Sequence, residues 1–127
     1  MKITAVLYVD KVEDSLTFWG ERMGFERVAE VPEGDRLAFV ILIRDGAELM
    51  IQSVESIRND TPQFAPESGT LCPSALFIEV DDFEDVLNRL SGYPIALRER
   101  KTFCGMREIG VREPGGHIVI FAKPVMQ

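Results

Sequence analysis

The sequence Val9-Asp10-Lys11-Val12-Glu13-Asp14-Ser15-Leu16 returns later in the chain as Val80-Asp81-Asp82-Phe83-Glu84-Asp85-Val86-Leu87. Val, Asp, Glu, Asp and Leu are identical in the two copies, which lie 71 residues apart, from position 9 to position 80, in a chain of 127. A weaker similarity aligns residues 46–51 with residues 116–121. A period this long indicates two copies of one supersecondary unit within a single fold rather than a solenoid.

The first copy predicts a strand followed by a helix. Residues 3–9 are rich in β-branched and aromatic side chains, as strands are. Asp10 is expected to cap the helix, with Glu13 at the reciprocal position of a capping box. Alternation along the strand puts three side chains on the face away from the helix: Thr4, Val6 and Tyr8. Three further strands are expected at residues 25–31, 36–44 and 48–53.

The second copy repeats this plan. Residues 74–80 predict a strand, and Asp81 with Glu84 repeats the capping box. The helix that follows carries an apolar stripe at helical spacing: Phe83, Val86, Leu87 and Leu90. Strands are then expected at residues 95–102, 106–112 and 117–123. The sequence therefore predicts an α+β fold with βαβββ twice, each helix covering one face of its sheet and leaving the other face free.

Residues 54–73, between the two copies, carry three prolines together with Gly, Ser, Thr, Asn and Asp, and are expected to form a connector. We therefore expect one domain, in which module one spans residues 1–53 and module two spans residues 74–127. A length of 127 residues and a hydrophobic fraction of 46% suit a single globular domain with a sizeable core.

The formal net charge of −7 argues against a nucleic acid as partner, because binding to a phosphate backbone needs clustered Lys and Arg. The densest basic group, Arg98, Arg100 and Lys101, is expected to line a solvated strand edge. The acidic surface either attracts cationic ligands or keeps the protein soluble. The longest apolar run, residues 37–43, is too short to cross a bilayer. With no secretion signal at the start, we expect a cytoplasmic protein with reduced thiols.

Three passages resemble the vicinal oxygen chelate superfamily, which contains glyoxalase I, extradiol dioxygenases, and the fosfomycin and bleomycin resistance proteins. The first is Val9-Asp10 with Ser15-Leu16-Thr17-Phe18-Trp19 and Met23-Gly24-Phe25, similar to the family's first strand, "S-L-x-F-Y" helix and "L-G-F". The second is Phe77-Ile78-Glu79-Val80-Asp81, similar to the opening of its second module.

The third passage is Gly105-Met106-Arg107-Glu108-Ile109-Gly110-Val111-Arg112-Glu113-Pro114-Gly115-Gly116-His117. It is similar to the family's "G-x-R-E-F-x-x-x-D-P-D-G-H" segment and closest to bleomycin resistance proteins, although Glu113 and Gly115 replace the two usual aspartates. The resemblance implies a curved mixed sheet of two tandem βαβββ modules, the glyoxalase/bleomycin resistance fold.

The resemblance also implies where the family's enzymes bind a divalent metal, through His, Glu or Gln in the first and last strand of each module. Matching the motifs puts four other residues at these positions: Thr4, Met50, Ala75 and Ile120. Hydroxyl and thioether groups are weak ligands for such ions, and Ala and Ile supply none. A register error of two residues would introduce Glu48 or Gln52 in one strand and Glu79 in another, still without a histidine. We therefore predict no metal and no cofactor.

The sequence also predicts no catalytic residue. His117, the single histidine, follows Pro114-Gly115-Gly116 and falls on the helix side of its strand, which favours a turn-stabilising role over a metal ligand. Cys104 has no apparent basic partner that would make it a nucleophile. The paired acids at residues 13–14 and 84–85 occupy the first turns of helices, where the dipole favours them. These observations argue against an enzyme.

The free sheet faces are expected to line a cup that binds a small molecule. Nine side chains are expected to point into it: Thr4, Val6, Tyr8, Met50, Gln52, Phe77, Glu79, Ile118 and Ile120. Phe39 and Ile41 join them if the all-apolar run takes that face, and Arg107 is expected near the rim. Trp19 either contacts the ligand or belongs to the core. Apolar walls with a few polar groups suit a small-molecule pocket, and the alternative is a filled groove that serves dimerisation.

Together these features predict a metal-independent binding protein of the bleomycin-resistance type. It would be a homodimer that sequesters a small aromatic or cationic compound. Two alternatives stay open: an enzyme of the glyoxalase or dioxygenase branch with displaced metal ligands, and an interaction module without a small ligand. Metal content tests the first alternative, and ligand-induced shifts in melting temperature test the second.

Overall fold

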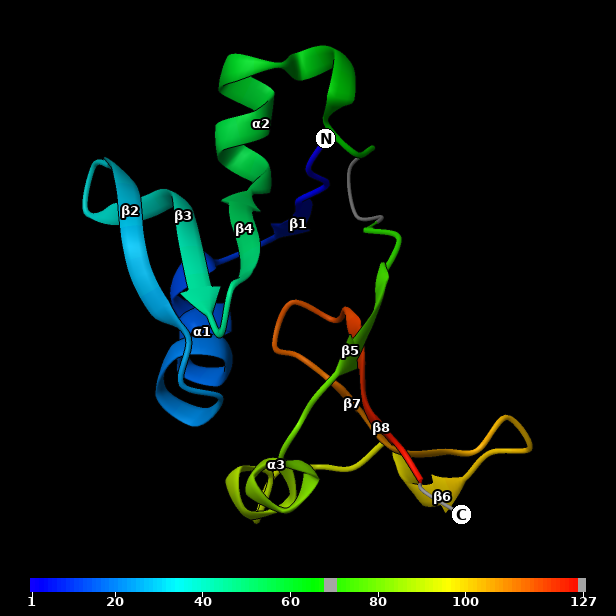
Figure 1. Cartoon of the computed structure of the whole chain (residues 1–127). Coiled ribbons are helices and arrows are strands. Elements are labelled where there is room, and N and C mark those ends of the chain that lie inside the picture. The colour runs from blue at the N-terminus through cyan, green and yellow to red at the C-terminus, as the bar shows by residue number, and fades with distance from the viewer. Residues whose placement is uncertain (68–70, 126–127) are drawn as a thin grey trace. The chain divides into compact units, whose positions relative to one another are not determined.

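The computed structural model describes residues 1–67 and 71–125. The chain divides into two compact units, Met1–Cys72 and Pro73–Gln127. Each unit contains one four-stranded sheet (Figure 1). No helix in the described part of the chain is long and apolar enough to cross a membrane.

The first unit begins with strand β1 (Ala5–Val9) and helix α1 (Val12–Leu16), which continues as the π-helix η1 (Thr17–Arg22). Three strands follow: β2 (Glu26–Glu33), β3 (Arg36–Arg44) and β4 (Ala47–Ser53). The sheet order is β1-β4-β3-β2, with β1 parallel to β4 and the other pairs antiparallel. This pairing places β2 at one edge of the sheet, where all eight of its residues are exposed.

The second unit has the same plan. Strand β5 (Ala75–Glu79) leads into helix α3 (Phe83–Arg89). Three strands follow: β6 (Leu97–Lys101), β7 (Met106–Arg112) and β8 (Ile118–Pro124). The sheet order β5-β8-β7-β6 repeats that of the first unit strand for strand. The α+β fold with βαβββ twice, predicted from the repeat, is therefore confirmed.

Corresponding elements of the two units start at the spacing of the sequence repeat. Helices α1 and α3 begin at Val12 and Phe83, and strands β4 and β8 begin at Ala47 and Ile118, so both pairs of elements start 71 residues apart. Asp10 and Asp81 each lie between the first strand of a unit and its helix. The two copies of the sequence therefore occupy the same place in the two units.

The predicted helix caps are wrong by one residue. Helix α1 has Lys11 as N-cap without a side-chain hydrogen bond, and Glu13 instead accepts a hydrogen bond of 2.7 Å from the Leu37 amide of β3. In helix α3 the N-cap is Asp82, whose Oδ1 accepts from the Asp85 amide at 3.0 Å. In both units the helix therefore starts one residue later than a cap at Asp10 or Asp81 requires.

The residues expected to form a connector contain a helix. Helix α2 (Val54–Asp60) continues directly from β4, and a 3-10 turn η2 (Pro62–Phe64) follows it (Figure 1). The Ser53 hydroxyl caps α2 by accepting a hydrogen bond from the Ser56 amide, and the apolar side of the helix buries Val54 and Ile57. Residues 68–70 of the predicted connector lie outside the described part of the chain.

Each unit has its core between the helix and one face of its sheet. In the first unit the fully buried side chains of this layer include Leu7, Val12, Val40, Leu42 and Ile51. In the second unit the corresponding layer contains Phe83, Val86, Val111, Val119 and Phe121. In both units burial of these apolar surfaces is the main stabilising term. The opposite face of each sheet is not covered by that helix.

Candidate functional site

The first unit presents one sheet face that its helix does not cover, here called the first free face. Strand register arranges its side chains in rows across the four strands. The central row is apolar: Val6, Met50, Ile41 and Ala29. The neighbouring row contains two aromatic residues and an amide: Tyr8, Gln52, Phe39 and Val31. All eight side chains keep some exposure, so this face is accessible.

The strand register also settles which face the all-apolar run 37–43 presents. Ala38, Val40 and Leu42 are buried on the helix side of β3. Alternation therefore puts Phe39 and Ile41 on the first free face, opposite Gln52 and Met50 of β4. The side chains predicted to line this face from strand β1, Val6 and Tyr8, lie in the same two rows.

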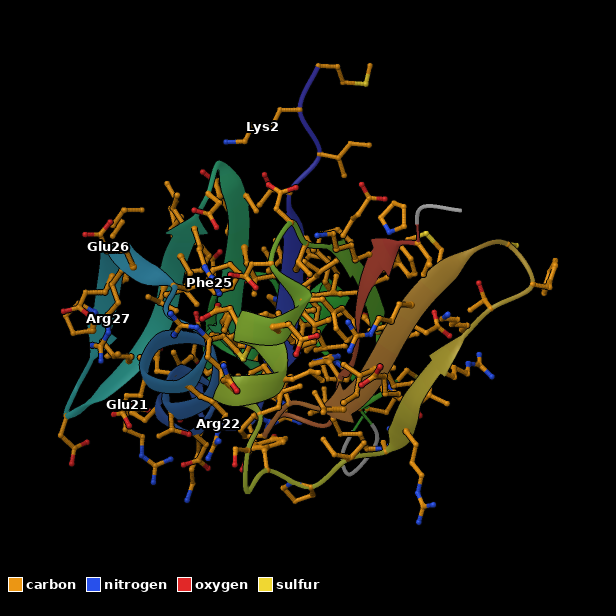
Figure 2. All side chains as sticks on the ribbon, turned by 60° about the horizontal axis from the view of Figure 1, so that its bottom comes forward. Lys2, Glu21, Arg22, Phe25, Glu26 and Arg27 are labelled. Atoms are coloured by element: carbon orange, nitrogen blue, oxygen red, sulfur yellow. The ribbon has the colours of Figure 1, made fainter. Side chains whose placement is uncertain are left out.

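The third row of the first free face is polar at its β1 end. The Thr4 hydroxyl donates a hydrogen bond of 3.1 Å to Glu48 Oε1, and the Lys2 ammonium lies 3.0 Å from Glu48 Oε2. Lys2 extends from the N-terminal segment (Figure 2). Its hydrogen bond, together with that of Thr4, lowers the pKa of Glu48 against the opposing effect of burial. Glu48 is therefore an ionised carboxylate at neutral pH that already has a cationic partner.

The second free face is the corresponding surface of the second unit. Its central row is again apolar: Phe77, Ile120, Gly110 and Leu97. The neighbouring row is charged: Glu79, Ala122, Glu108 and Arg100. Within it Arg100 Nε donates a hydrogen bond of 2.8 Å to Glu108 Oε1. This face therefore combines an apolar row with a row that carries three charged side chains.

The absence of a side chain at Gly110 allows Leu97 and Ile120 to pack closely in the central row of the second free face. A Cβ atom at this position would lie 2.9 Å from Leu97 Cβ and 3.7 Å from Ile120 Cγ1. The first of these distances is shorter than van der Waals contact permits. The missing side chain therefore brings Leu97 of β6 and Ile120 of β8 together over the backbone of β7.

The sequence profile of the Glyoxalase/Bleomycin resistance protein/Dioxygenase superfamily matches residues 3–121. The chain belongs to this superfamily. A search of the curated proteins gives no match.

Solved structures of this superfamily's fold resemble the chain over nearly its whole length. TioX from Micromonospora sp. ML1 aligns with a TM-score of 0.78 and 16% identity, covering 98% of this chain and 99% of that one. Lactoylglutathione lyase from Agrobacterium tumefaciens aligns with a TM-score of 0.73 and 17% identity, covering 97% and 92%. A glyoxalase/bleomycin resistance protein/dioxygenase from Nocardioides gives 0.76 and 17%, covering 98% and 84%. At these identities the likeness shows the fold alone.

The four positions that the superfamily resemblance assigns to metal ligands lie on the free faces. Met50 and Ile120 occupy the same place in the two central rows. Ala75 lies opposite Ile118, and the Thr4 hydroxyl is bonded to Glu48. Residues 1–67 and 71–125 contain no group of three or more His, Cys, Asp or Glu side chains that could hold a metal ion. The donor set at these positions does not fit a divalent metal.

Two residues predicted to contact a ligand point elsewhere. Trp19 is fully buried in the core of the first unit, in edge-to-face contact with Phe18 and Phe25 at centroid distances of 5.1 and 5.2 Å. Trp19 was expected either to contact the ligand or to belong to the core, and the structure places it in the core. The helical stripe that contains Trp19 is the stripe that packs against the sheet.

Arg107, predicted at the rim, lies instead on the helix side of β7. Its guanidinium carbon is 4.5 Å from the centre of the Phe83 ring, and its nitrogens lie 2.6 Å from Glu99 Oε2 and 2.8 Å from Glu84 Oε1. The hydrogen bonds to Glu99 and then Glu84 raise the pKa of Arg107 above its ordinary value. Arg107 therefore links β7 to β6 and to α3, and it alternates with Glu108, which takes the free face.

His117 has the turn-stabilising role that the sequence predicted. It is buried, and its Nδ1 accepts a hydrogen bond of 2.9 Å from the Ser74 amide just before β5. The His117 amide donates to Glu113 Oε1 at 3.3 Å across the turn between β7 and β8. The imidazole therefore ties this turn to the first strand of the second unit.

Sequence reasoning missed the Arg100–Glu108 pair. Strand β6 lies at the edge of the sheet with Arg98, Arg100 and Lys101 exposed, as predicted. However, a β-bulge between Leu97 and Arg100 brings both side chains to the second free face. Three positions apart, they would point to opposite faces of a regular strand. The sequence contains no signal for this bulge.

Proposed function

We propose that this chain is a metal-independent small-molecule binding protein of the bleomycin-resistance type, which sequesters an aromatic or cationic compound on the free faces of its two sheets. One observation carries the proposal: the central row of each free face is apolar, and it contains Met50 or Ile120 at a position where the resemblance places a metal ligand. Apolar surface with a few polar groups is the usual lining of a small-molecule site.

Exposed aromatic side chains support contact with a ligand. Phe77 is 58% exposed in the central row of the second free face, and Phe39 and Tyr8 lie partly exposed in one row of the first. Large apolar side chains gathered on one surface are typical of a binding surface. Gln52 lies between Tyr8 and Phe39, and its Nε2 donates a hydrogen bond of 3.1 Å to Ser56 Oγ. We assign to its amide oxygen the orientation of a donor group of the ligand.

A carboxylate is available for a cationic group. Glu48 already has Lys2 as a partner at 3.0 Å. Glu79 is exposed at the end of β5, and its carboxylate has no hydrogen bond or ion pair with any residue that the structure describes. We assign the recognition of a positive charge to Glu79, beside the aromatic surface of Phe77 on the same strand face.

The test is a melting-temperature screen of the metal-free protein against a library of aromatic compounds that includes aromatic amines. A compound that binds only the folded state raises the melting temperature, and at a fixed concentration it does so more the tighter it binds. We expect hits whose shifts are unchanged by Zn²⁺, Ni²⁺, Mn²⁺ or Fe²⁺, are reduced by Phe77→Ala, and, for amines, are reduced by Glu79→Gln. Phe64→Ala is the matched control, because Phe64 is 64% exposed but belongs to η2 and not to a strand of either sheet.

Two outcomes would replace the proposal. Shifts that appear only with added metal would favour the enzyme with displaced ligands. A screen without any shift would favour an interaction module that binds no small molecule. Equal effects of Phe77→Ala and Phe64→Ala would show that the ligand binds elsewhere.

We propose further that the protein is a homodimer. The support is the amount of sheet surface that each chain leaves exposed, including the whole of edge strand β2, from which Glu26 and Arg27 project (Figure 2). Exposed edges and apolar faces are commonly covered by a second copy. Sedimentation velocity at micromolar concentration should give about twice the chain mass of 14.3 kDa. A single species at the chain mass would contradict the dimer.

A further inference from the structure

In the Arg100–Glu108 ion pair the carboxylate is buried and the guanidinium is exposed. The Glu108 side chain is only 8% exposed, whereas that of Arg100 is 58% exposed, and the bond between them is 2.8 Å long. Removing a carboxylate from water is costly, and a pair with one exposed partner contributes little to stability. An apolar residue at position 108 would fill this place without that cost. The ion pair is therefore better explained by its effect on the orientation of the Arg100 guanidinium than by its contribution to stability.

Glu108 fixes one nitrogen of Arg100 and leaves the others available. The bond runs from Nε, and the guanidinium makes no other hydrogen bond or ion pair with the described residues. Arg107 provides the contrast, since its guanidinium is engaged by both Glu84 and Glu99. A guanidinium held in one plane presents its remaining N–H groups as a fork that matches two oxygens of a carboxylate or phosphate.

An apolar surface lies beside this fork. The central row of the second free face, next to the charged row, contains Leu97 and Ile120, drawn together over Gly110. Adjacent rows on one face are two residues apart, roughly 7 Å along a strand. A ring resting on Leu97 and Ile120 can therefore carry an anionic group as far as Arg100. Glu79 lies three strands away in the same row, on the order of 14 Å, so its charge is largely screened from that group.

We propose that Arg100, positioned by Glu108, binds an oxyanion of the ligand, so that the second free face takes an aryl carboxylate or an aryl phosphate. This inference rests on the proposed function and names a further chemical group of its ligand. It adds a basic contact at one end of the charged row to the acidic contact of Glu79 at the other end.

The experiment follows the Arg100 Nε–H resonance in 15N-labelled protein during titration with phenyl phosphate and with phenylacetate. Phenylacetamide serves as the neutral counterpart of phenylacetate. We expect both anions, and not the amide, to shift this resonance in a saturable manner, and the tighter of the two identifies the class of oxyanion. Inorganic phosphate should bind more weakly than phenyl phosphate, because it lacks the ring that contacts Leu97 and Ile120.

Variants separate recognition from net charge. Arg100→Gln should weaken binding of the anions by about tenfold, as the loss of one charge-assisted hydrogen bond does. Arg98→Gln is the matched control, because it removes the same charge from the same exposed strand and should change affinity by less than about twofold. Glu108→Gln should also weaken binding: it raises the local positive charge, but a neutral amide oxygen holds the guanidinium less firmly than a carboxylate does. Bulk electrostatics alone predicts tighter binding for that variant.

Equal losses in Arg98→Gln and Arg100→Gln would overturn the proposal, as would phenylacetamide binding as tightly as phenylacetate. Tighter anion binding by Glu108→Gln would overturn the positioning role. Equal affinity for inorganic phosphate and phenyl phosphate would remove the ring contact and leave an adventitious ion only. If the anions fail while neutral or amine compounds still raise the melting temperature, the proposed function stands without an anionic group.

Discussion

The two free faces are built on one scaffold but differ in chemistry. Their central rows match in character, since Val6, Met50 and Ile41 of the first correspond to Phe77, Ile120 and Gly110 of the second. The neighbouring rows do not match. Tyr8, Gln52, Phe39 and Val31 make the first one neutral, whereas Glu79, Ala122, Glu108 and Arg100 make the second one charged. The repeat therefore preserves the strand order and the apolar central row, and the two free faces differ in the row beside it.

The helices of the two units differ in a related way. In the first unit α1 continues through the π-helix η1, and both Phe18 and Trp19 are buried in the core. In the second unit α3 ends at Arg89, and Leu90 takes the position that corresponds to Trp19 at the shift of 71 residues. The first core is therefore centred on an aromatic cluster, whereas the second uses an aliphatic side chain at that place.

The largest expected effect tests this difference between the cores. Trp19→Ala should lower the free energy of unfolding by about 3–5 kcal/mol, because it removes a fully buried indole and its two aromatic contacts. Urea unfolding should be followed by circular dichroism, since Trp19 is the only tryptophan. Trp19→Phe is the control and should cost less. A loss below about 1 kcal/mol for Trp19→Ala would contradict the placement of the indole in the core.

A smaller effect is expected at the glycine that distinguishes the central rows. Gly110→Ala should destabilise the protein by about 1–3 kcal/mol, because the new Cβ would lie 2.9 Å from Leu97 Cβ. Gly20→Ala is the control: its Cβ would approach only the Phe25 carbonyl, at 3.8 Å, and the change should be neutral or slightly stabilising. Equal stability of both variants and the wild type would show that Leu97 does not pack over Gly110.

Two buried serines of the first unit should respond with opposite signs. Ser15 corresponds to the buried Val86 of the second unit, and its hydroxyl is buried without a hydrogen-bond partner among the described residues. Ser15→Ala should therefore raise the free energy of unfolding by about 1 kcal/mol. Ser53→Ala should lower it by about 1 kcal/mol, because the Ser53 hydroxyl caps α2. Thermal unfolding of both variants measures the difference, and destabilisation by Ser15→Ala would mean that this hydroxyl is satisfied.

The smallest effect concerns the polar row of the first free face, where Glu48 takes the place of Ile118 in the second. Because Lys2 and Thr4 lower its pKa in the folded protein, Glu48 contributes stability that is present above its unfolded pKa and lost as pH falls through the folded one. Glu48→Gln should therefore lower the melting temperature at neutral pH, and the difference should vanish in acid. A difference that is constant across the pH range would show that the charge is not involved.

The sequence predicted those features that depend on local patterns. Alternation in residues 3–9 placed Val6 and Tyr8 correctly, and the repeat gave the order of elements in both units. The position of His117 after the glycine turn indicated its role in that turn. These features follow from side-chain periodicity and turn chemistry, which are written in neighbouring residues.

The remaining features depend on contacts that no local pattern contains. Helix α2 was not predicted, because prolines and small polar residues surround it and only Val54 and Ile57 form its buried side. Its N-cap is Ser53. The bulge in β6 puts Arg100 on the same face as Leu97, so its pairing with Glu108 could not be predicted from strand alternation. Arg107 was assigned to the rim, although alternation with Glu108 puts it on the helix side.

Elemental analysis of the purified protein, together with calorimetric titration with Zn²⁺, Ni²⁺, Mn²⁺ and Fe²⁺, tests whether binding is independent of metal. Thr4 just before β1, Ala75 in β5, Met50 in β4 and Ile120 in β8 supply no adequate ligand set. We predict no stoichiometric metal in the protein as purified and no saturable heat on titration. One tightly held metal ion per chain would contradict metal-independent binding and would favour the enzyme with displaced ligands.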